Sequence, residues 1–210
     1  MYIAFEGVDG CGKSTMAQKL ALRRGMMLTG EPFGKDDALS FESPVAALAR
    51  LALDRKYTEK ISCDARELIL LANRAIGHAF EIEPWVKQGR HIVTDRSFLS
   101  GMVYAKYNGW TFDRWFSIAI ESQAVRCLPD AIVYCEPPLT PHIEKREGDA
   151  YDNAPAEFHE KIAGLFDLAL DWIRRREAIK IIRFEVDFGL LPEENFVHLE
   201  AVLDKSIGKF

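Results

Sequence analysis

Long apolar stretches are absent from this sequence, and no run approaches the 18 uninterrupted apolar residues that a transmembrane helix needs. The first residues lack the basic and apolar regions of a secretory signal peptide. Cysteine is scarce: Cys11, Cys63, Cys127 and Cys135 lie far apart and form no CxxC pair, as in a protein with reduced thiols. These absences exclude a membrane protein and a disulfide-stapled secreted domain, and we expect a cytoplasmic protein.

Charge of one sign is not in large excess either, since the net charge is −5 with 28% charged residues. This balance argues against a nucleic-acid duplex as partner, but it is compatible with a small anionic ligand held by a few local cations. The 210 residues, 48% of them apolar, suit one globular domain. We therefore predict a single domain over residues 1–210, in which the polar segment at about 137–155 forms a short lid.

Short apolar strands alternate with helical segments, which predicts an α/β fold: a parallel sheet covered by helices on both faces, in three layers. The expected strands are 2–6, 26–29, 91–94, 131–135 and 179–184. The expected helices are 14–24, one opened by Ser43 and Pro44, 64–89, 98–107, 111–127, 155–177 and one after Pro192. Asp64 is expected to cap its helix, with Glu67 completing a capping box.

Residues 7–14, GVDGCGKS, fit the phosphate-loop pattern G-x-x-x-x-G-K-[ST] at every required position, between the first strand and the first helix. The glycines let the backbone curl around a phosphate with several N–H groups pointing inward. Lys13 can reach the β- and γ-phosphates of a nucleoside triphosphate, and the Ser14 hydroxyl can bind Mg²⁺. The residues expected to bind ATP are Gly7, Val8, Asp9, Gly10, Cys11, Gly12, Lys13, Ser14 and Thr15.

The rest of the sequence distinguishes a switch protein from a kinase. The N/TKxD tetrad with which a GTPase reads guanine is absent. A kinase of small molecules must instead hold two anions close together, which requires arginines that neutralise their charge. The chain offers Arg50, Arg74, Arg96 and Arg146 for this purpose. These features favour a P-loop kinase.

Four separated segments resemble the thymidylate kinase family: FEGVDGCGKST near the first strand, the turn TGEPFG, LANR at 71–74, and DRSFLSGMVYAK from Asp95. Their order and spacing match that family over roughly residues 2–187. The resemblance implies a five-stranded parallel sheet, transfer of the γ-phosphoryl group of ATP to dTMP with Mg²⁺, and a homodimer.

The same resemblance implies a role for each matching residue. Arg96 would lie between the donor and acceptor phosphates, and Asp95 would act on Mg²⁺ or its water ligands. Asp9 would hold the 3′-hydroxyl of the acceptor, Arg74 would read the carbonyl edge of thymine, and Tyr104 would pack against the deoxyribose. The remaining substrate-binding residues implied by the match are Pro32, Phe33, Arg50, Leu70, Ser100, Gly101 and Tyr151.

The chain departs from the family pattern at three places. Leu70 stands where a phenylalanine usually stacks on thymine, and this change reduces aromatic stacking. Gly30 replaces the arginine that usually begins the Glu-Pro turn. Ala150 replaces the usual lid arginine, so Arg146 is the lid cation that we expect to join Lys13, Asp95 and Arg96 in catalysis.

Two alternatives therefore stand beside a thymidylate kinase. Leu70 and Gly30 are also compatible with a P-loop kinase for another nucleoside monophosphate. Ala150 is compatible with a nucleotide-binding module that does not catalyse, although the intact Lys13, Asp95 and Arg96 argue against it. The leading hypothesis is a thymidylate kinase.

Overall fold

The computed structural model describes residues 1–34, 44–136 and 155–208. Most of the segment expected to form a lid, with Arg146, Ala150 and Tyr151, lies outside the described residues.

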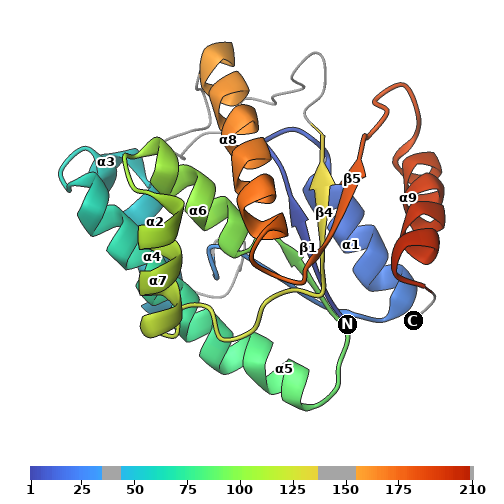
Figure 1. The fold of residues 1–210 in the computed structure, drawn as a ribbon, viewed down its shortest axis with the longest axis horizontal. Helices are drawn as coiled ribbons and strands as arrows, with labels where there is room; N and C mark the ends of the chain where they lie inside the picture. Colours follow the sequence, from blue (N-terminus) through green and yellow to red (C-terminus); the bar gives the residue numbers. More distant parts are fainter. Residues whose placement is uncertain (35–43, 137–154, 209–210) are drawn as a thin grey trace.

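Five parallel strands form the central sheet in the order β2-β3-β1-β4-β5 (Figure 1). The strands are β1 (Tyr2–Glu6), β2 (Met27–Gly30), β3 (Ile92–Asp95), β4 (Ala131–Cys135) and β5 (Lys180–Phe184). The central strands are apolar over nearly their whole length because helices bury both of their faces. Phe5 of β1 pairs with Asp95 of β3 and with Val133 of β4, so the carboxyl ends of these strands meet at one edge.

Helices cover both faces of this sheet (Figure 1). Those of the described ranges are α1 (Lys13–Arg24), α2 (Pro44–Leu53), α3 (Arg55–Thr58), α4 (Cys63–Gly77), the π-helical η1 (His78–Ile82), α5 (Glu83–Lys87), α6 (Phe98–Tyr107), α7 (Phe112–Glu121), α8 (Ala156–Arg174) and α9 (Pro192–Ile207). The helices α1 and α9 pack together on one side, whereas α6 and α8 pack together on the other. The predicted three-layer P-loop fold is confirmed.

The start of α4 differs from its predicted form. Ser62 caps this helix by accepting a hydrogen bond from the Ala65 backbone N–H at 3.1 Å. Asp64 instead accepts from the indole N–H of Trp110, and Glu67 accepts from the Asn108 side-chain amide. The expected capping box is therefore wrong. Ser62 occupies the cap position, and the carboxylates of Asp64 and Glu67 bind side chains from another part of the chain.

Farther along the same helical stretch, the backbone widens into a π-helical turn just before Pro84 and then continues as α5. The Glu83 N–H bonds to the carbonyl of His78, five residues earlier, which defines the π-helical turn. Pro84 follows directly, and it has no N–H and clashes with a regular helical carbonyl, which accounts for a wider turn at this place. A different interruption ends α7 earlier than predicted, where Gln123 takes a left-handed φ of 56°.

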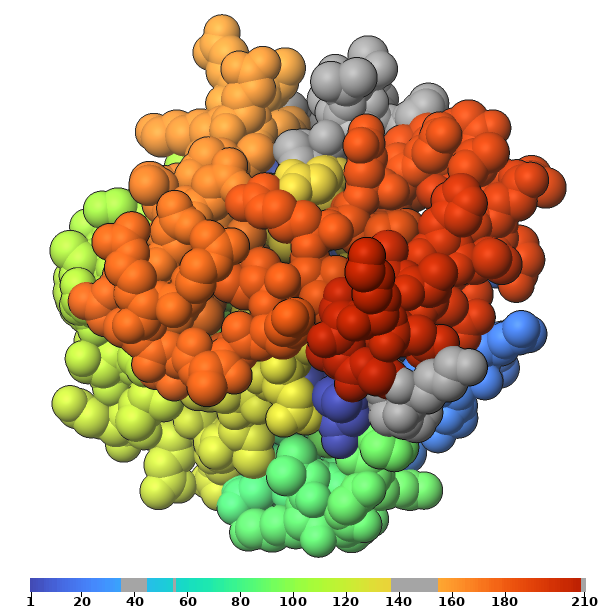
Figure 2. All heavy atoms as spheres, turned by 45° about the vertical axis from the view of Figure 1, so that its right-hand side comes forward, coloured from blue at the N-terminus to red at the C-terminus, as the bar shows by residue number. Residues whose placement is uncertain are grey.

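The core lies between the sheet and its two helical layers. The rings of Tyr134 on β4 and Phe166 on α8 contact each other at a centroid distance of 5.5 Å, which ties α8 to the sheet. Residues from 155 onward, orange to red, cover most of the face seen in Figure 2. Within the described ranges, no helix is both long and apolar enough to cross a membrane.

Candidate active site

The loop between β1 and α1 is built on glycines that no other residue could readily replace. Gly7, Gly10 and Gly12 have φ of 145°, 80° and 84°, a region that side chains with a Cβ rarely adopt. A Cβ at Gly7 would lie 2.6 Å from the carbonyl oxygen of Cys135 and 2.7 Å from the Cys11 sulfur. The residues predicted to bind ATP thus form one continuous segment, 7–15, from the end of β1 into the first turn of α1. The Cys11 side chain is buried in the core.

Two cations converge on Asp9 in this loop. The Lys13 ammonium lies 3.4 Å from Asp9 Oδ1 and 3.3 Å from the Val8 carbonyl oxygen. The Arg96 guanidinium donates Nη2–H to the same Asp9 oxygen and Nη1–H to the Gly7 carbonyl oxygen at 3.2 Å. Burial lowers the pKa of Arg96, but attraction to Asp9, with smaller contributions from Tyr104, Asp95 and Glu6, together outweighs this and holds the pKa well above its usual value. Arg96 therefore remains a fixed positive charge.

The backbone at Arg96 is itself unusual, with φ at 69°. This left-handed conformation is costly for a residue with a side chain and often occurs at functional sites. It follows β3 directly and turns the guanidinium back over the phosphate loop, toward Gly7 and Asp9.

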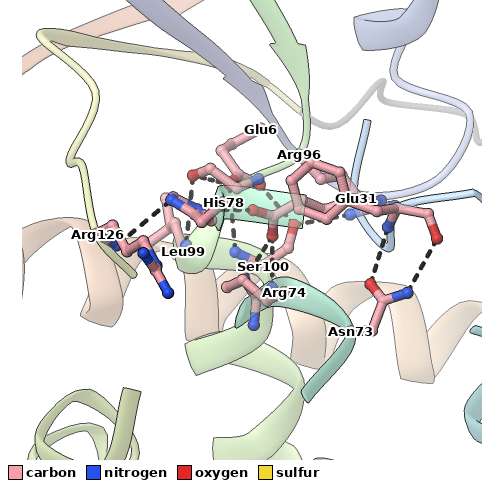
Figure 3. A network of polar contacts seen from close by, with 11 residues as sticks. Glu6, Glu31, Asn73, Arg74, His78, Arg96, Leu99, Ser100 and Arg126 are labelled. Carbon is pink, nitrogen blue, oxygen red and sulfur yellow. Dashed lines mark hydrogen bonds and ion pairs between the residues drawn. The ribbon is translucent and has the colours of Figure 1, made fainter. Parts of the chain in front are cut away.

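A buried carboxylate, Glu6, supports Arg96 through Ser100 (Figure 3). It accepts hydrogen bonds from the backbone N–H of Ser97 at 2.7 Å, the Ser97 hydroxyl at 2.7 Å and the Ser100 hydroxyl. Ser100 in turn accepts from Arg96 Nη1 at 3.0 Å. Burial raises the pKa of Glu6 to about 7, against the hydrogen bonds from Ser100 and Ser97, which lower it. Glu6 thus anchors the start of α6 and, through Ser100, the Arg96 side chain.

A cavity beside the phosphate loop brings together eight of the residues predicted to hold the acceptor. These are Asp9, Pro32, Leu70, Arg74, Arg96, Ser100, Gly101 and Tyr104. The Arg96 guanidinium carbon lies 5.7 Å from the centre of the Tyr104 ring, so charge and aromatic surface adjoin within it. The predicted Tyr151 lies outside the described residues.

Two predicted acceptor residues do not line this cavity. Phe33 is fully buried against Gly77, where an added Cβ would lie 2.1 Å from the phenyl ring. The backbone N–H of Phe33 also bonds to the Asn73 side chain at 2.9 Å. Arg50 lies on α2 and is not among the lining residues, although Leu53 of the same helix is. Phe33 therefore fixes the turn after β2 onto α4.

Four lining residues were not expected from the sequence: Glu31, Leu53, Arg66 and Glu67. Arg66 precedes Leu70 by one helical turn and Arg74 by two, so the helical period places all three on one face of α4. This spacing could have identified Arg66.

Burial raises the pKa of Glu67, although a hydrogen bond from Asn108 lowers it. Glu31 belongs to the TGEPFG turn, but no feature of the neighbouring sequence indicates that its partner is Arg74.

The donors near the phosphate loop fit a magnesium ion. Asp95 ends β3, and its Oδ1 atom is buried without a hydrogen-bond partner among the described residues. Ser14 lies in the first turn of α1 and is partly exposed. Mg²⁺ prefers oxygen ligands and usually takes only one or two from the protein, the rest coming from phosphates and water. These two residues could supply that small share.

A glycine-built phosphate loop at the edge of a parallel sheet, beside a cavity that contains Arg66, Arg74 and Arg96, defines a P-loop kinase of small anionic substrates. The family model described as Thymidylate kinase matches residues 5–183. The chain belongs to the thymidylate kinase family, and it is accordingly an ATP-dependent nucleoside monophosphate kinase.

Known thymidylate kinases are similar to this chain in sequence and in structure. That of Campylobacter lari is 28% identical over 195 residues, which is 90% of this chain and 93% of the relative. That of Helicobacter hepaticus is 34% identical over 155 residues, covering 73% and 74%. The match to the Helicobacter pylori enzyme, at 38% identity, spans only 51% of each chain. The crystal structure of thymidylate kinase from Ehrlichia chaffeensis has a TM-score of 0.69 at 18% identity, covering 97% and 98%.

Proposed function

We propose that this chain transfers the γ-phosphoryl group of ATP to dTMP, which gives ADP and dTDP. The observation that supports this most strongly is the Arg96 guanidinium, which bonds to the phosphate loop on one side and lines the acceptor cavity on the other. In-line phosphoryl transfer between two anions depends on positioning and on charge stabilisation, and it needs no covalent enzyme intermediate.

The described residues divide this work between the two substrates. The loop amides and Lys13 hold the donor phosphates, and Arg96 neutralises charge that develops on the transferring group. Asp9 accepts a hydrogen bond from the 3′-hydroxyl of dTMP, and Arg74 donates a hydrogen bond to the base. Tyr104 packs on the sugar. Arg146 of the lid would add a further cation.

We further propose a magnesium ion, a homodimer and a cytoplasmic location. Mg²⁺ would be held by Ser14 and Asp95, and it would neutralise phosphate charge. The homodimer is supported by exposed apolar side chains on α2, α4 and η1, which a second copy would cover. These are Leu51, Leu68 and Phe80. Light scattering after gel filtration tests the dimer.

A coupled ADP-release assay with ATP and Mg²⁺ tests the reaction, using dTMP, dUMP, dCMP, dGMP and no acceptor. We expect dTMP to have the highest kcat/KM. A higher kcat/KM for another acceptor would show that the pocket around Leu70 recognises a different base. ATP binding without turnover of any acceptor would contradict the proposed reaction.

A further inference from the structure

Arg74 uses only part of its guanidinium for contacts within the protein (Figure 3). Its Nε–H donates to Glu31 Oε2 at 2.7 Å, and Nη2 pairs with the same oxygen. The side chains of Arg74 and Glu31 are 7% and 2% exposed, so the pair is shielded from water. The third nitrogen, Nη1, is buried and has no hydrogen-bond partner among the described residues. Because Arg74 lines the acceptor cavity, this nitrogen is available for a ligand there.

Packing on both sides limits how the guanidinium can turn. Its carbon lies 5.1 Å from the centre of the Trp115 ring. On α6, a Cβ added at Gly101 would lie 2.9 Å from both Nη1 and Nη2, so the helix backbone approaches the guanidinium closely. With Trp115 and the α6 backbone fixed, the direction of Nη1 depends on where the Glu31 carboxylate holds the Nε and Nη2 edge of the guanidinium.

Glu31 is itself held in place from several directions. Its backbone N–H bonds to the Asp95 carbonyl oxygen at 2.9 Å. His78 Nε2 lies 3.6 Å from Glu31 Oε1, and both side chains are 2% exposed. The other ring nitrogen of His78, Nδ1, accepts the backbone N–H of Arg126 at 3.4 Å. Nε2 is therefore the ring nitrogen that faces the carboxylate, although neither Nε2 nor Glu31 Oε1 has a hydrogen-bond partner among the described residues.

The net charge of the Arg74–Glu31 pair also fits a neutral ligand. A buried guanidinium without a counter-ion would attract an anion, whereas the Glu31 carboxylate neutralises Arg74. The cavity therefore presents an N–H donor at this end without a net charge from the pair. Such a donor suits the carbonyl oxygen of a neutral pyrimidine and not a second phosphate.

We propose that Glu31, oriented by His78, is a positioning residue that directs Arg74 Nη1 toward a carbonyl oxygen of the acceptor base and so sets base recognition. This inference rests on the proposed function, because it assumes a pyrimidine nucleotide in the cavity. Glu31 acts only through Arg74 and is not a catalytic residue.

Steady-state kinetics of Glu31→Gln test the proposal. Loss of a charge-assisted hydrogen bond to Arg74 should raise KM for dTMP by about 10- to 100-fold. The kcat should stay within about threefold of wild type and KM for ATP should not change, since the phosphate loop is untouched. The preference for dTMP over dCMP should fall, because a misdirected donor no longer selects a carbonyl oxygen.

Two further comparisons keep the result specific. His78→Gln retains a donor toward Glu31 and should stay near wild-type KM, whereas His78→Leu should raise KM for dTMP several-fold. Glu193→Gln is the matched control, because Glu193 pairs with Lys19 on the surface outside the cavity, and the change should leave both KM values unchanged.

The possible outcomes separate the two hypotheses. A wild-type protein that does not phosphorylate dTMP contradicts the proposed function itself. A wild-type protein that does, together with a Glu31→Gln variant whose KM and base preference match those of Glu193→Gln, overturns the positioning role. If Glu31→Gln fails to fold, equal KM values for His78→Leu and His78→Gln overturn it instead.

Discussion

Arg96 joins the two halves of the site through its own side chain, which reaches the phosphate loop and the acceptor cavity together. Burial would normally disfavour this charge, and attraction to Asp9 and neighbouring groups offsets that cost. The cation is thus already in position before a phosphoryl group arrives. Such a fixed charge stabilises a transition state without reorganisation during the reaction.

Replacing Arg96 by alanine should lower kcat for dTMP by at least about a hundredfold, on the scale of a lost charge stabiliser. Turnover at saturating ATP and dTMP measures the effect, and Arg96→Lys should recover part of it. Near-normal turnover of Arg96→Ala would exclude Arg96 from the catalytic step.

Glu6 should make stability depend on pH. Its folded-state pKa of about 7 exceeds its ordinary value of 4.5 because of burial. The folded protein therefore keeps a proton that the unfolded chain releases between these values. The stability contribution is full below pH 4.5 and is lost as the pH rises to about 7, on the order of 3 kcal/mol.

Urea unfolding at pH 5 and pH 8 checks this dependence. Glu6→Gln mimics the protonated carboxyl group, so its free energy of unfolding should change less between the two pH values than that of wild type. Glu83→Gln removes a partly exposed carboxylate and should retain the wild-type difference. An equal difference in Glu6→Gln and wild type would contradict the raised pKa.

At the scale of elements, the turn after β2 is fixed onto α4 by shape. The Phe33 ring occupies the space that a side chain at position 77 would need, and Asn73 bonds to both the N–H and the carbonyl of Phe33 at 2.9 Å. The turn carries Glu31, and α4 carries Arg74. This packing therefore supports the pair at the end of the cavity.

Gly77→Ala should destabilise the protein by about 2 kcal/mol or more, because its Cβ would overlap the Phe33 ring. The same change in a Phe33→Ala background should cost at least about 1 kcal/mol less, since the two residues are in contact. Gly164→Ala in α8 meets nothing within 4 Å and should instead stabilise by roughly 0.5–1 kcal/mol. Urea unfolding of the variants measures these differences, and additive effects would contradict the proposed overlap.

Local patterns identified the phosphate loop and most elements from the sequence alone. The GKS signature and the Asp95-Arg96 pair follow strands, and parallel strands bring such ends together. The cap of α4 was missed because Asp64 has a distant partner, Trp110. The Glu31–Arg74 pair joins residues 43 positions apart, and no local rule identifies that contact.

For the whole molecule, the strand order determines where the substrates meet. Because β1 is central and β3 lies beside it, the phosphate loop after β1 adjoins Arg96 after β3. The cavity then extends from this junction to α4, α6 and the turn after β2. Both substrates would therefore lie at the carboxyl edge of the sheet, where parallel sheets usually bind ligands.

Binding of dTMP should stabilise the whole fold, because the cavity joins α4, α6 and the phosphate loop. At a concentration 100 times Kd, linkage adds about 2.7 kcal/mol, which raises Tm by roughly 5–10 °C in a chain of this size. Thermal unfolding with and without dTMP measures the shift. Arg74→Ala should lose most of it, whereas an unchanged shift in that variant would contradict base binding at Arg74.

The central claim is that the phosphate loop and the cavity act together on ATP and dTMP. Chromatographic quantification of nucleotides after incubation of wild type and Lys13→Ala with ATP, dTMP and Mg²⁺ tests this most directly. The proposed reaction predicts equal amounts of dTDP and ADP from wild type and almost none from Lys13→Ala. ADP without dTDP, or equal dTDP formation by Lys13→Ala, would contradict it.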